Sequence, residues 1–403
     1  MLSVADARAR ILGAFSPLAA EIVSVADALG RGLAEDIAAR VTQPPHAVSA
    51  MDGYAVRAED TAALPAMLRV VGEAPAGQAH PHPLGPGEAV RIFTGAPLPD
   101  GADAIVIQED TTREGDTVTV HEAATAGRWI RPAGLDFAAG AVGLRAGRRL
   151  TARDVGLAAA MNHPWLPVHR RPRVALLGTG DEVVLPGDPL GAHQIVSSNG
   201  FALAAAVTAG GGVPLNLGIA PDNRAALADR IAAARGCDLL VTAGGASVGA
   251  HDLVQEVLKD SGARLDFWKI AMRPGKPLMF GHLDATPVLG LPGNPVSAMV
   301  CAILFLMPAL AVMRGGDGTL PHRRARLAVD LPGNGGREDY IRATLETDSH
   351  GGQQVAPLGV QDSSVLSSLA AAEALLIRPP HAPPATAGDS VDILPLDAGP
   401  SLV

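Results

Sequence analysis

Cationic side chains of an uncommon kind gather in one short stretch of this chain. Of its 32 lysines and arginines only three are lysines, and two of these, Lys269 and Lys276, flank Arg273 within residues 268–276. The ammonium group of lysine is a compact point charge that suits a phosphate or another oxyanion. We therefore interpret the stretch as a candidate anion-binding site; chance clustering in a solvated loop is the alternative.

Three carboxylates occupy comparable positions in the same region. Glu182 and Asp222 each come shortly after a strand-like run, and Asp252 opens a helical pattern after the glycine-rich residues 244–249. Glycines let the backbone approach a ligand, and the first N–H groups of a helix attract an anion. A carboxylate at the same corner repels a bare phosphate, so we expect a divalent cation between them. Glu182, Asp222 and Asp252 are thus candidate metal ligands and catalytic residues.

A single pattern of elements must position these residues. From residue 173 to 314, strand-like runs alternate with helical ones, which predicts a doubly wound, mostly parallel α/β domain. The carboxyl ends of parallel strands meet at one edge of the sheet, where ligands bind. Five loops converge on that edge. They contain the other substrate-binding candidates of this domain: Thr179, Gly180, Asp181, Gly244, Gly245, Ser247, Val248, Gly249, Pro292, Gly293 and Asn294.

The flanking regions differ in their predicted secondary structure. Residues 1–40, including 22–29, are predicted to be helical, residues 65–150 to be β-rich, and residues from about 320 onward to form a small β-barrel-like domain. Residues 296–313 carry no charge and are long enough for a membrane span. Because Pro308 interrupts them and no second such stretch occurs, we predict a buried core helix instead.

The composition argues against several classes of protein. A net charge of −9 disfavours general nucleic-acid binding. The two cysteines, Cys237 and Cys301, lack a CxxC spacing, and no signal peptide is visible, so we expect a cytoplasmic protein with reduced thiols and no membrane association. No Walker A sequence occurs, no GxGxxG motif follows the first strand-like run, and the histidines lack zinc-ligand spacing.

Seven short motifs together carry a resemblance to a known family. They are SAMDGYAV at 49–56, RIFTGA at 91–96, ADAIVIQED at 102–110, GTGDE at 178–182, GGASVGAHD at 244–252, WKIAMRPGKP at 268–277 and LPGNPVS at 291–297. Each motif alone is modest, but in this order and spacing they are specific, and the match covers essentially the whole chain. The chain resembles the molybdopterin molybdenumtransferases of the MoeA family and is similar to the C-terminal domain of gephyrin.

The resemblance implies an activity and further site residues. Members of the family insert molybdenum from molybdate into adenylylated molybdopterin, with Mg²⁺-dependent hydrolysis of the pyrophosphate link and release of AMP and Mo-molybdopterin. The resemblance adds Asp52 and Asp136 to the catalytic candidates, and Thr94, Arg342 and Ser363 to the substrate-binding ones. The alternatives are a molybdopterin adenylyltransferase, which the α/β domain alone also resembles, and a non-catalytic, gephyrin-like scaffold.

The resemblance also implies an architecture. It predicts a homodimer with the site in the cleft between subunits, and other molybdenum-cofactor proteins as partners. An α/β domain similar to MoaB and MogA is expected at 172–316 and a barrel-like domain at 317–403. A β-rich insert domain is expected at 26–41 with 54–137, and an elongated dimerisation domain at 1–25 with 42–53 and 138–171.

Three positions depart from the family pattern. Ser197 stands where aspartate is common, Arg273 where some relatives have lysine, and Asp362 where glycine is frequent. Arginine keeps the positive charge, whereas Asp362 adds a negative charge near an anionic ligand.

Overall fold

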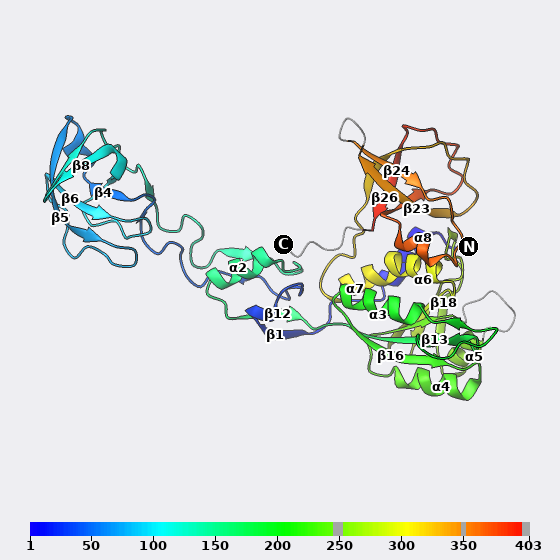
Figure 1. Cartoon of the computed structure of the whole chain (residues 1–403). Helices are drawn as coiled ribbons and strands as arrows, with labels where there is room; N and C mark the ends of the chain where they lie inside the picture. Colours follow the sequence, from blue (N-terminus) through cyan, green and yellow to red (C-terminus); the bar gives the residue numbers. More distant parts are fainter. Residues whose placement is uncertain (245–252, 348–351, 397–403) are drawn as a thin grey trace. The chain divides into compact units, whose positions relative to one another are not determined.

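The computed structural model describes residues 1–244, 253–347 and 352–396, and the chain divides into two units. The larger unit comprises Met1–Glu35, Ala146–Arg153 and Leu166–Val403, and the smaller one comprises Asp36–Arg145 and Asp154–Trp165. In Figure 1 the smaller unit carries the labels β4, β5, β6 and β8, and each unit can be followed by itself along the colour bar.

A six-stranded sheet forms the centre of the larger unit. Its order is β16-β13-β17-β21-β20-β18, and the first four strands are parallel to one another, whereas β20 runs antiparallel to both of its neighbours. Continuous apolar runs make this possible, because a strand covered by helices on both faces is buried along its whole length. The strands are β13 (Arg173–Thr179), β16 (Val213–Ala220), β17 (Leu239–Ala243), β18 (Arg264–Phe267), β20 (Met279–Leu283) and β21 (Thr286–Leu291).

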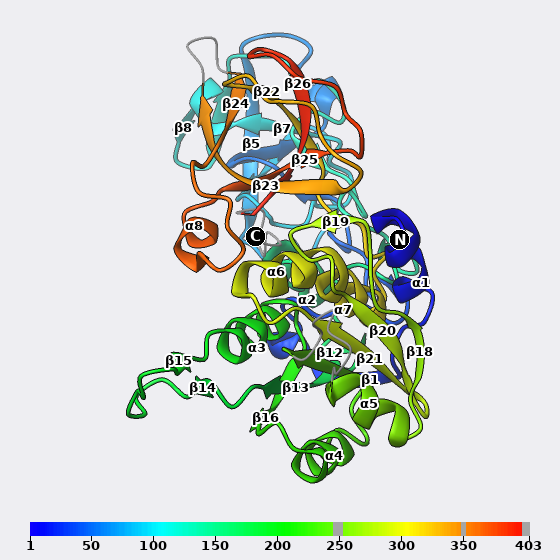
Figure 2. The same cartoon turned by 90° about the vertical axis from the view of Figure 1, so that its right-hand side faces the viewer.

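Helices cover both faces of this sheet, as Figures 1 and 2 show. Successive residues of β17 alternate between two core clusters: Leu239 and Val241 belong to one, and Leu240 to the other. The prediction of a doubly wound, mostly parallel α/β domain is therefore confirmed. The first cluster contains residues of α1 (Val4–Leu12), α3 (Asn199–Ala209), α6 (Pro295–Cys301) and α7 (Met307–Met313), and the second contains residues of α4 (Arg224–Ala233) and α5 (Leu253–Asp260).

The uncharged stretch near residue 300 is one long helix. It runs from Pro295 to Met313, and a π-helical segment, Ala302–Leu306, joins α6 to α7. Pro308 cannot donate a backbone hydrogen bond, and a widened turn before it accommodates the missing bond. The helix is long and apolar enough to cross a membrane, but 72% of its most apolar window is buried inside the protein. This burial agrees with the predicted core helix.

A closed barrel of five strands follows the α/β domain. The order β23-β24-β22-β26-β25 closes through pairing of β25 with β23, and Leu327, Val355 and Ile393 lie in its core. The short strand β19 (Met272–Arg273) leaves the α/β domain and pairs in parallel with β23. The barrel strands are β22 (Arg323–Leu327), β23 (Glu338–Thr347), β24 (Gln353–Pro357), β25 (Ala374–Arg378) and β26 (Ser390–Pro395), with α8 (Leu366–Ala370) before β25.

The smaller unit is rich in strands, as predicted. Its main sheet has the order β7-β4-β6-β5-β9-β8, and both faces of the sheet are buried: Tyr54 and Ala55 of β4 enter different core clusters. Short ladders join β2 to β11 and β3 to β10. The elements are β2 (Ile37–Ala38), β3 (Val48–Ser49), β4 (Gly53–Val56), β5 (Ala66–Ala74), β6 (Glu88–Ile92), β7 (Ala104–Ile107), β8 (Thr111–Glu114), β9 (Thr117–Val120), β10 (Ile130–Arg131), β11 (Val142–Leu144) and α2 (Ala152–Ala160).

One secondary-structure prediction is wrong. Residues 22–29 are not helical: β1 (Ala20–Ser24) pairs with β12 (Trp165–His169), and a single 3-10 turn, Val25–Asp27, follows. The β-branched residues Ile22 and Val23 suit a strand once a partner strand is available. That partner lies about 140 residues later in the chain, so local periodicity could not reveal it.

Candidate active site

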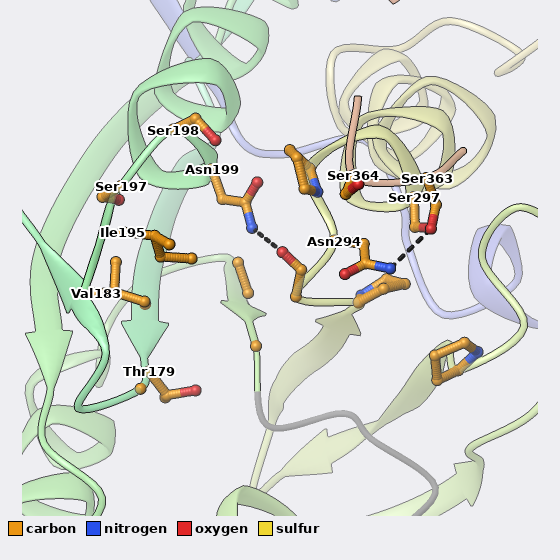
Figure 3. Close-up of a pocket in the computed structure, with 18 of the residues that line it drawn as sticks. Thr179, Val183, Ile195, Ser197, Ser198, Asn199, Asn294, Ser297, Ser363 and Ser364 are labelled. Carbon is orange, nitrogen blue, oxygen red and sulfur yellow. Dashed lines mark hydrogen bonds between the residues drawn. The ribbon is translucent and has the colours of Figure 1, made fainter. Parts of the chain in front are cut away.

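A large cavity opens at the carboxyl edge of the six-stranded sheet. Its volume is about 1280 Å³, and residues from all five predicted loops line it. Further segments of the wall include an extended arm with β14 (Val183–Val184) and β15 (Ile195–Val196), and the barrel loop that contains Ser363. In Figure 3, Val183, Ile195 and Ser197 lie on one side of the cavity, and Asn294, Ser297 and Ser363 on the other.

The structure brings most of the predicted site residues of this unit together. The carboxylates Glu182 and Asp222 and the cations Arg273 and Lys276 all line the cavity. They come from three separate loops, so only the parallel sheet places them side by side. The other predicted residues that line it are Thr179, Gly180, Gly244, Pro292, Gly293, Asn294 and Ser363.

Gly244 allows the backbone to pass close to β13. Its φ is +98°, and a Cβ at this position would lie 2.9 Å from both the carbonyl oxygen and the Oγ1 of Thr179. Only glycine adopts this conformation at such a distance without strain. Gly244 therefore brings the end of β17 close to the end of β13 at the cavity.

Among the residues that the structure describes, three predicted ones of this unit do not line the cavity. The Asp181 carboxylate accepts a hydrogen bond of 2.9 Å from the backbone N–H of Asp222, and so it fixes the loop that carries that residue. Lys269 precedes the cavity-lining segment 273–277 in the chain but does not line the cavity. Arg342 is fully buried in the barrel, and burial lowers the pKa of its guanidinium.

Arg342 shapes the barrel loop from beneath. Its Nε donates to Ser368 Oγ at 3.1 Å and its Nη2 to the carbonyl of Val360 at 3.2 Å. Its backbone N–H and carbonyl bond the side-chain amide of Gln361 at 3.0 and 2.9 Å. Within the described residues Nη1 has no partner. These bonds hold the loop that presents Ser363 to the cavity.

The barrel loop is joined to the α/β domain at the cavity wall. Asn294 donates from its amide nitrogen to Ser363 Oγ at 2.7 Å, and Ser363 accepts through its carbonyl from Val296 N–H at 3.1 Å. Figure 3 shows the side-chain bond as a dashed line. Asn294 and Ser363, which the sequence suggested separately, are therefore hydrogen-bonded to each other.

The charges around the cavity are balanced among the residues that the structure describes. Arg273, Lys276 and Arg337 are cationic, and Glu182, Asp222 and Asp362 are anionic. Two hydrogen bonds from Ser364, through its hydroxyl (2.6 Å) and its N–H (2.8 Å), lower the pKa of Asp362 and keep it ionised. A multiply anionic ligand in this balanced site would gain from an added cation.

Sequence reasoning missed part of the wall. Asn199 lines the cavity at the start of α3 and donates to the Gly293 carbonyl at 2.7 Å, and Ser297 lines it at the start of α6. Both are polar residues at the first turn of an otherwise apolar helix, and this was the available signal. The missed lining residues with polar side chains are Ser198, Asn199, Ser297, Arg337, Gln361 and Ser364. Ser197 and Asp362, which the sequence analysis names as departures from the family pattern, also line the cavity.

Some predicted residues lie outside the described part of the chain. These are Asp252, the third candidate metal ligand, and the loop residues Gly245, Ser247, Val248 and Gly249.

The smaller unit holds the three remaining candidates. Asp52 Oδ1 accepts two hydrogen bonds of 2.8 Å from Thr94, one from the backbone N–H and one from the hydroxyl. These bonds, aided by the nearby positive charge of Arg91, lower the pKa of Asp52. Asp136 lines a second cavity of about 540 Å³, where His46 and Arg131 are also exposed. Because its pKa is lowered, Asp52 is a fully ionised hydrogen-bond acceptor at neutral pH.

We expect Thr94→Val to raise the pKa of Asp52 part of the way back to its ordinary value. The hydroxyl bond is lost, but the backbone N–H at position 94 remains. Because the folded pKa of Asp52 is below the unfolded one, its contribution to stability is present above the unfolded pKa and is lost as pH falls through the folded pKa. Carboxyl-carbon NMR titration measures the change.

Thr112→Val is the matched control for this titration. The Thr112 hydroxyl bonds His121 Nε2 at 2.9 Å in the same unit and makes no contact with Asp52. If Thr94→Val leaves the titration midpoint of Asp52 unchanged, that result would contradict the hydrogen bond assigned between the Thr94 hydroxyl and Asp52.

Comparisons with known proteins agree along the whole chain. The model of the MoeA N-terminal region (domain I and II) matches residues 2–162, that of a probable molybdopterin binding domain matches 175–312, and that of the MoeA C-terminal region (domain IV) matches 324–396. The chain is 40% identical over 384 residues to molybdopterin molybdenumtransferase 2 of Mycobacterium tuberculosis, covering 92% of this chain and 94% of that protein.

Two further relatives extend these matches. The molybdopterin molybdenumtransferase of Haemophilus influenzae is 34% identical over 402 residues, covering 98% of this chain and 99% of that one. The crystal structure of the molybdopterin biosynthesis MoeA protein from Pyrococcus horikoshii OT3 is 30% identical, with a TM-score of 0.86 over 98% of this chain and 100% of that chain. With the mixed-charge cavity at the sheet edge, these matches identify the chain as a member of the MoeA family of molybdopterin molybdenumtransferases.

Proposed function

We propose that this protein inserts molybdenum from molybdate into adenylylated molybdopterin. Water cleaves the pyrophosphate link, AMP leaves with one phosphate, and the other phosphate stays on molybdopterin. The two dithiolene thiols then bind the metal, and their protons leave with one oxo group of molybdate as water. The observation that carries the proposal is one cavity at the sheet edge that unites carboxylates with cations. The ligand it suits is multiply anionic and requires a cation, and adenylylated molybdopterin and molybdate are both anions.

The described residues fit a Mg²⁺ ion that is held by few protein ligands. They contain no group of three or more His, Cys, Asp or Glu side chains arranged to hold a metal ion. Mg²⁺ commonly keeps several waters and binds through one or two carboxylates plus substrate phosphates. Glu182 and Asp222, both exposed and both lining the cavity, suit that mode of binding. When bound, the ion would neutralise phosphate charge and polarise the link that breaks.

The protein's own residues would divide the remaining tasks. Arg273 and Lys276 would bind oxyanions through charge-assisted hydrogen bonds, because both present donors to the cavity. Ser363 and Asn294 would orient the ligand from the barrel side, where they already bond each other. The long arm with Val183 and Ile195 offers apolar surface for a ring system and would exclude water from one side of it.

The quaternary structure and location are part of the same proposal. We propose a cytoplasmic homodimer in which Asp52, Thr94 and Asp136 of a second copy complete the site, because their own unit offers an ionised carboxylate and a second cavity. The domain boundaries would be 1–25 with 42–53 and 138–171, 26–41 with 54–137, 172–316 and 317–403. Sedimentation of the purified chain as a monomer would contradict the dimer.

One assay tests the activity. Purified protein given adenylylated molybdopterin, molybdate and Mg²⁺ is expected to release AMP, and removing either molybdate or Mg²⁺ should suppress that release. Chromatographic quantification of AMP measures the reaction. Release of no AMP would refute the proposal, and ATP-dependent formation of adenylylated molybdopterin would identify an adenylyltransferase instead.

A further inference from the structure

The barrel places a buried carboxylate directly behind the cavity. Asp339 lies on β23, its residue is only 3% exposed, and Arg273 is its one side-chain partner among the described residues. A buried carboxylate loses its hydration, so an isolated charge at this position would be strongly destabilising. The buried charge of Asp339 therefore requires that the guanidinium of Arg273 remain beside it.

Arg273 faces the cavity at the same time. Its side chain is 60% exposed, and it lines the cavity wall. Its Nη2 donates to Asp339 Oδ2. An arginine has five N–H donors in a rigid plane, so this one bond leaves other donors free for a ligand.

The backbone fixes this pair in register. β19 and β23 are parallel, with Arg273 opposite Asp339 and Met272 opposite Glu338. The Glu338 N–H also donates to the Ala271 carbonyl at 2.9 Å. The ion pair therefore lies at a strand junction between the α/β domain and the barrel, so the guanidinium has little freedom to swing away.

We propose that Asp339 is a positioning residue, which holds the guanidinium of Arg273 in the orientation that binds an oxyanion. This inference rests on the proposed function, which assigns Arg273 to anion binding. It also explains why arginine occupies a position where some relatives have lysine. A single ammonium group would have to divide its charge between the buried carboxylate and the ligand. The planar guanidinium of arginine can donate hydrogen bonds to both at once.

The test is a double-mutant cycle read by molybdate binding. Calorimetric titration of molybdate into the wild-type protein, Asp339→Asn, Arg273→Lys and the double variant gives four dissociation constants. We expect about tenfold weaker binding for Asp339→Asn, of the order seen when a residue that orients a ligand-binding group is lost. The double variant should bind no more weakly than Arg273→Lys alone, because Asp339 acts through Arg273. In turnover, the KM for molybdate should rise in Asp339→Asn more than kcat falls.

A matched ion pair separates positioning from general stability. Asp238 accepts hydrogen bonds from Arg170 Nη1 at 2.7 Å and from Arg173 N–H at 2.8 Å, at the amino ends of β13 and β17, opposite the cavity edge. Asp238→Asn should lower the melting temperature but leave the molybdate affinity unchanged.

Four results would overturn the inference. They are wild-type affinity in Asp339→Asn, equal losses of affinity in Asp339→Asn and Asp238→Asn, losses that simply add in the double variant, and no molybdate binding by the wild-type protein. Failure of the proposed function is distinguishable, since it would abolish AMP release while the binding cycle stayed intact.

Discussion

Replacing Asp222 with asparagine is expected to lower kcat/KM for AMP release roughly 100-fold while the chain keeps its fold. The Asp222 side chain is exposed and lines the cavity, and the loop is held through its backbone N–H by Asp181 rather than by its own carboxylate. Asparagine has the same shape but no charge, so the variant should lose its hold on Mg²⁺ and little else. Initial rates of AMP release at several Mg²⁺ concentrations measure the effect, and high Mg²⁺ should restore part of the activity.

Asp229→Asn controls for the loss of one negative charge. Asp229 lies on the exposed surface of α4 in the same domain and does not line the cavity. Its replacement should leave both kcat/KM and the Mg²⁺ dependence unchanged. Full activity in Asp222→Asn, or a parallel loss in both variants, would remove Asp222 from the proposed metal site.

The second large effect concerns the core. We expect Phe305→Ala to lower the free energy of unfolding of the larger unit by about 3–5 kcal/mol, because the side chain is fully buried and its loss leaves a cavity. Since about 1 kcal/mol shifts the melting temperature of a domain of this size by about 2–4 °C, the melting temperature should fall by roughly 6–20 °C. Differential scanning calorimetry records the shift.

Phe201→Ala is the matched control, because it makes the same chemical change at an exposed position. Phe201 lies on α3 with 52% of its surface exposed. Its truncation should change the free energy of unfolding by no more than about 0.5 kcal/mol. If the two variants melt alike, the helix Pro295–Met313 is not the core helix that its burial indicates.

The α/β domain was the most predictable part of the chain, for a physical reason. A strand that is covered by helices on both faces is apolar along its whole length. Runs such as Val174 to Leu177 and Leu239 to Val241 show this pattern in the sequence itself. The β1 strand was mistaken for a helix because its partner, β12, is distant in sequence. A two-stranded ladder takes its stability from that pairing and not from its own residues.

The site was predictable where residues follow strands and unpredictable where they do not. Glu182, Asp222, Arg273 and Lys276 were found because the edge of a parallel sheet collects the ends of its strands. Asn199 and Ser297 were missed because a polar residue in the first turn of a helix more often satisfies the helix end than contacts a ligand. Arg342 belongs to the structure beneath the site, since its hydrogen bonds are made inside the barrel.

By itself the sequence determined the parallel sheet, the barrel-like C-terminal region, and the loops in which carboxylates and cations stand, because strand periodicity and glycine-rich turns are local properties. Only the tertiary structure decided which of those charged groups share a wall and which hold one another. The pairing of Arg273 with Asp339, 66 positions apart in the chain, arises from strand register between two domains. Register is fixed by packing of the whole fold, so no short motif contains it.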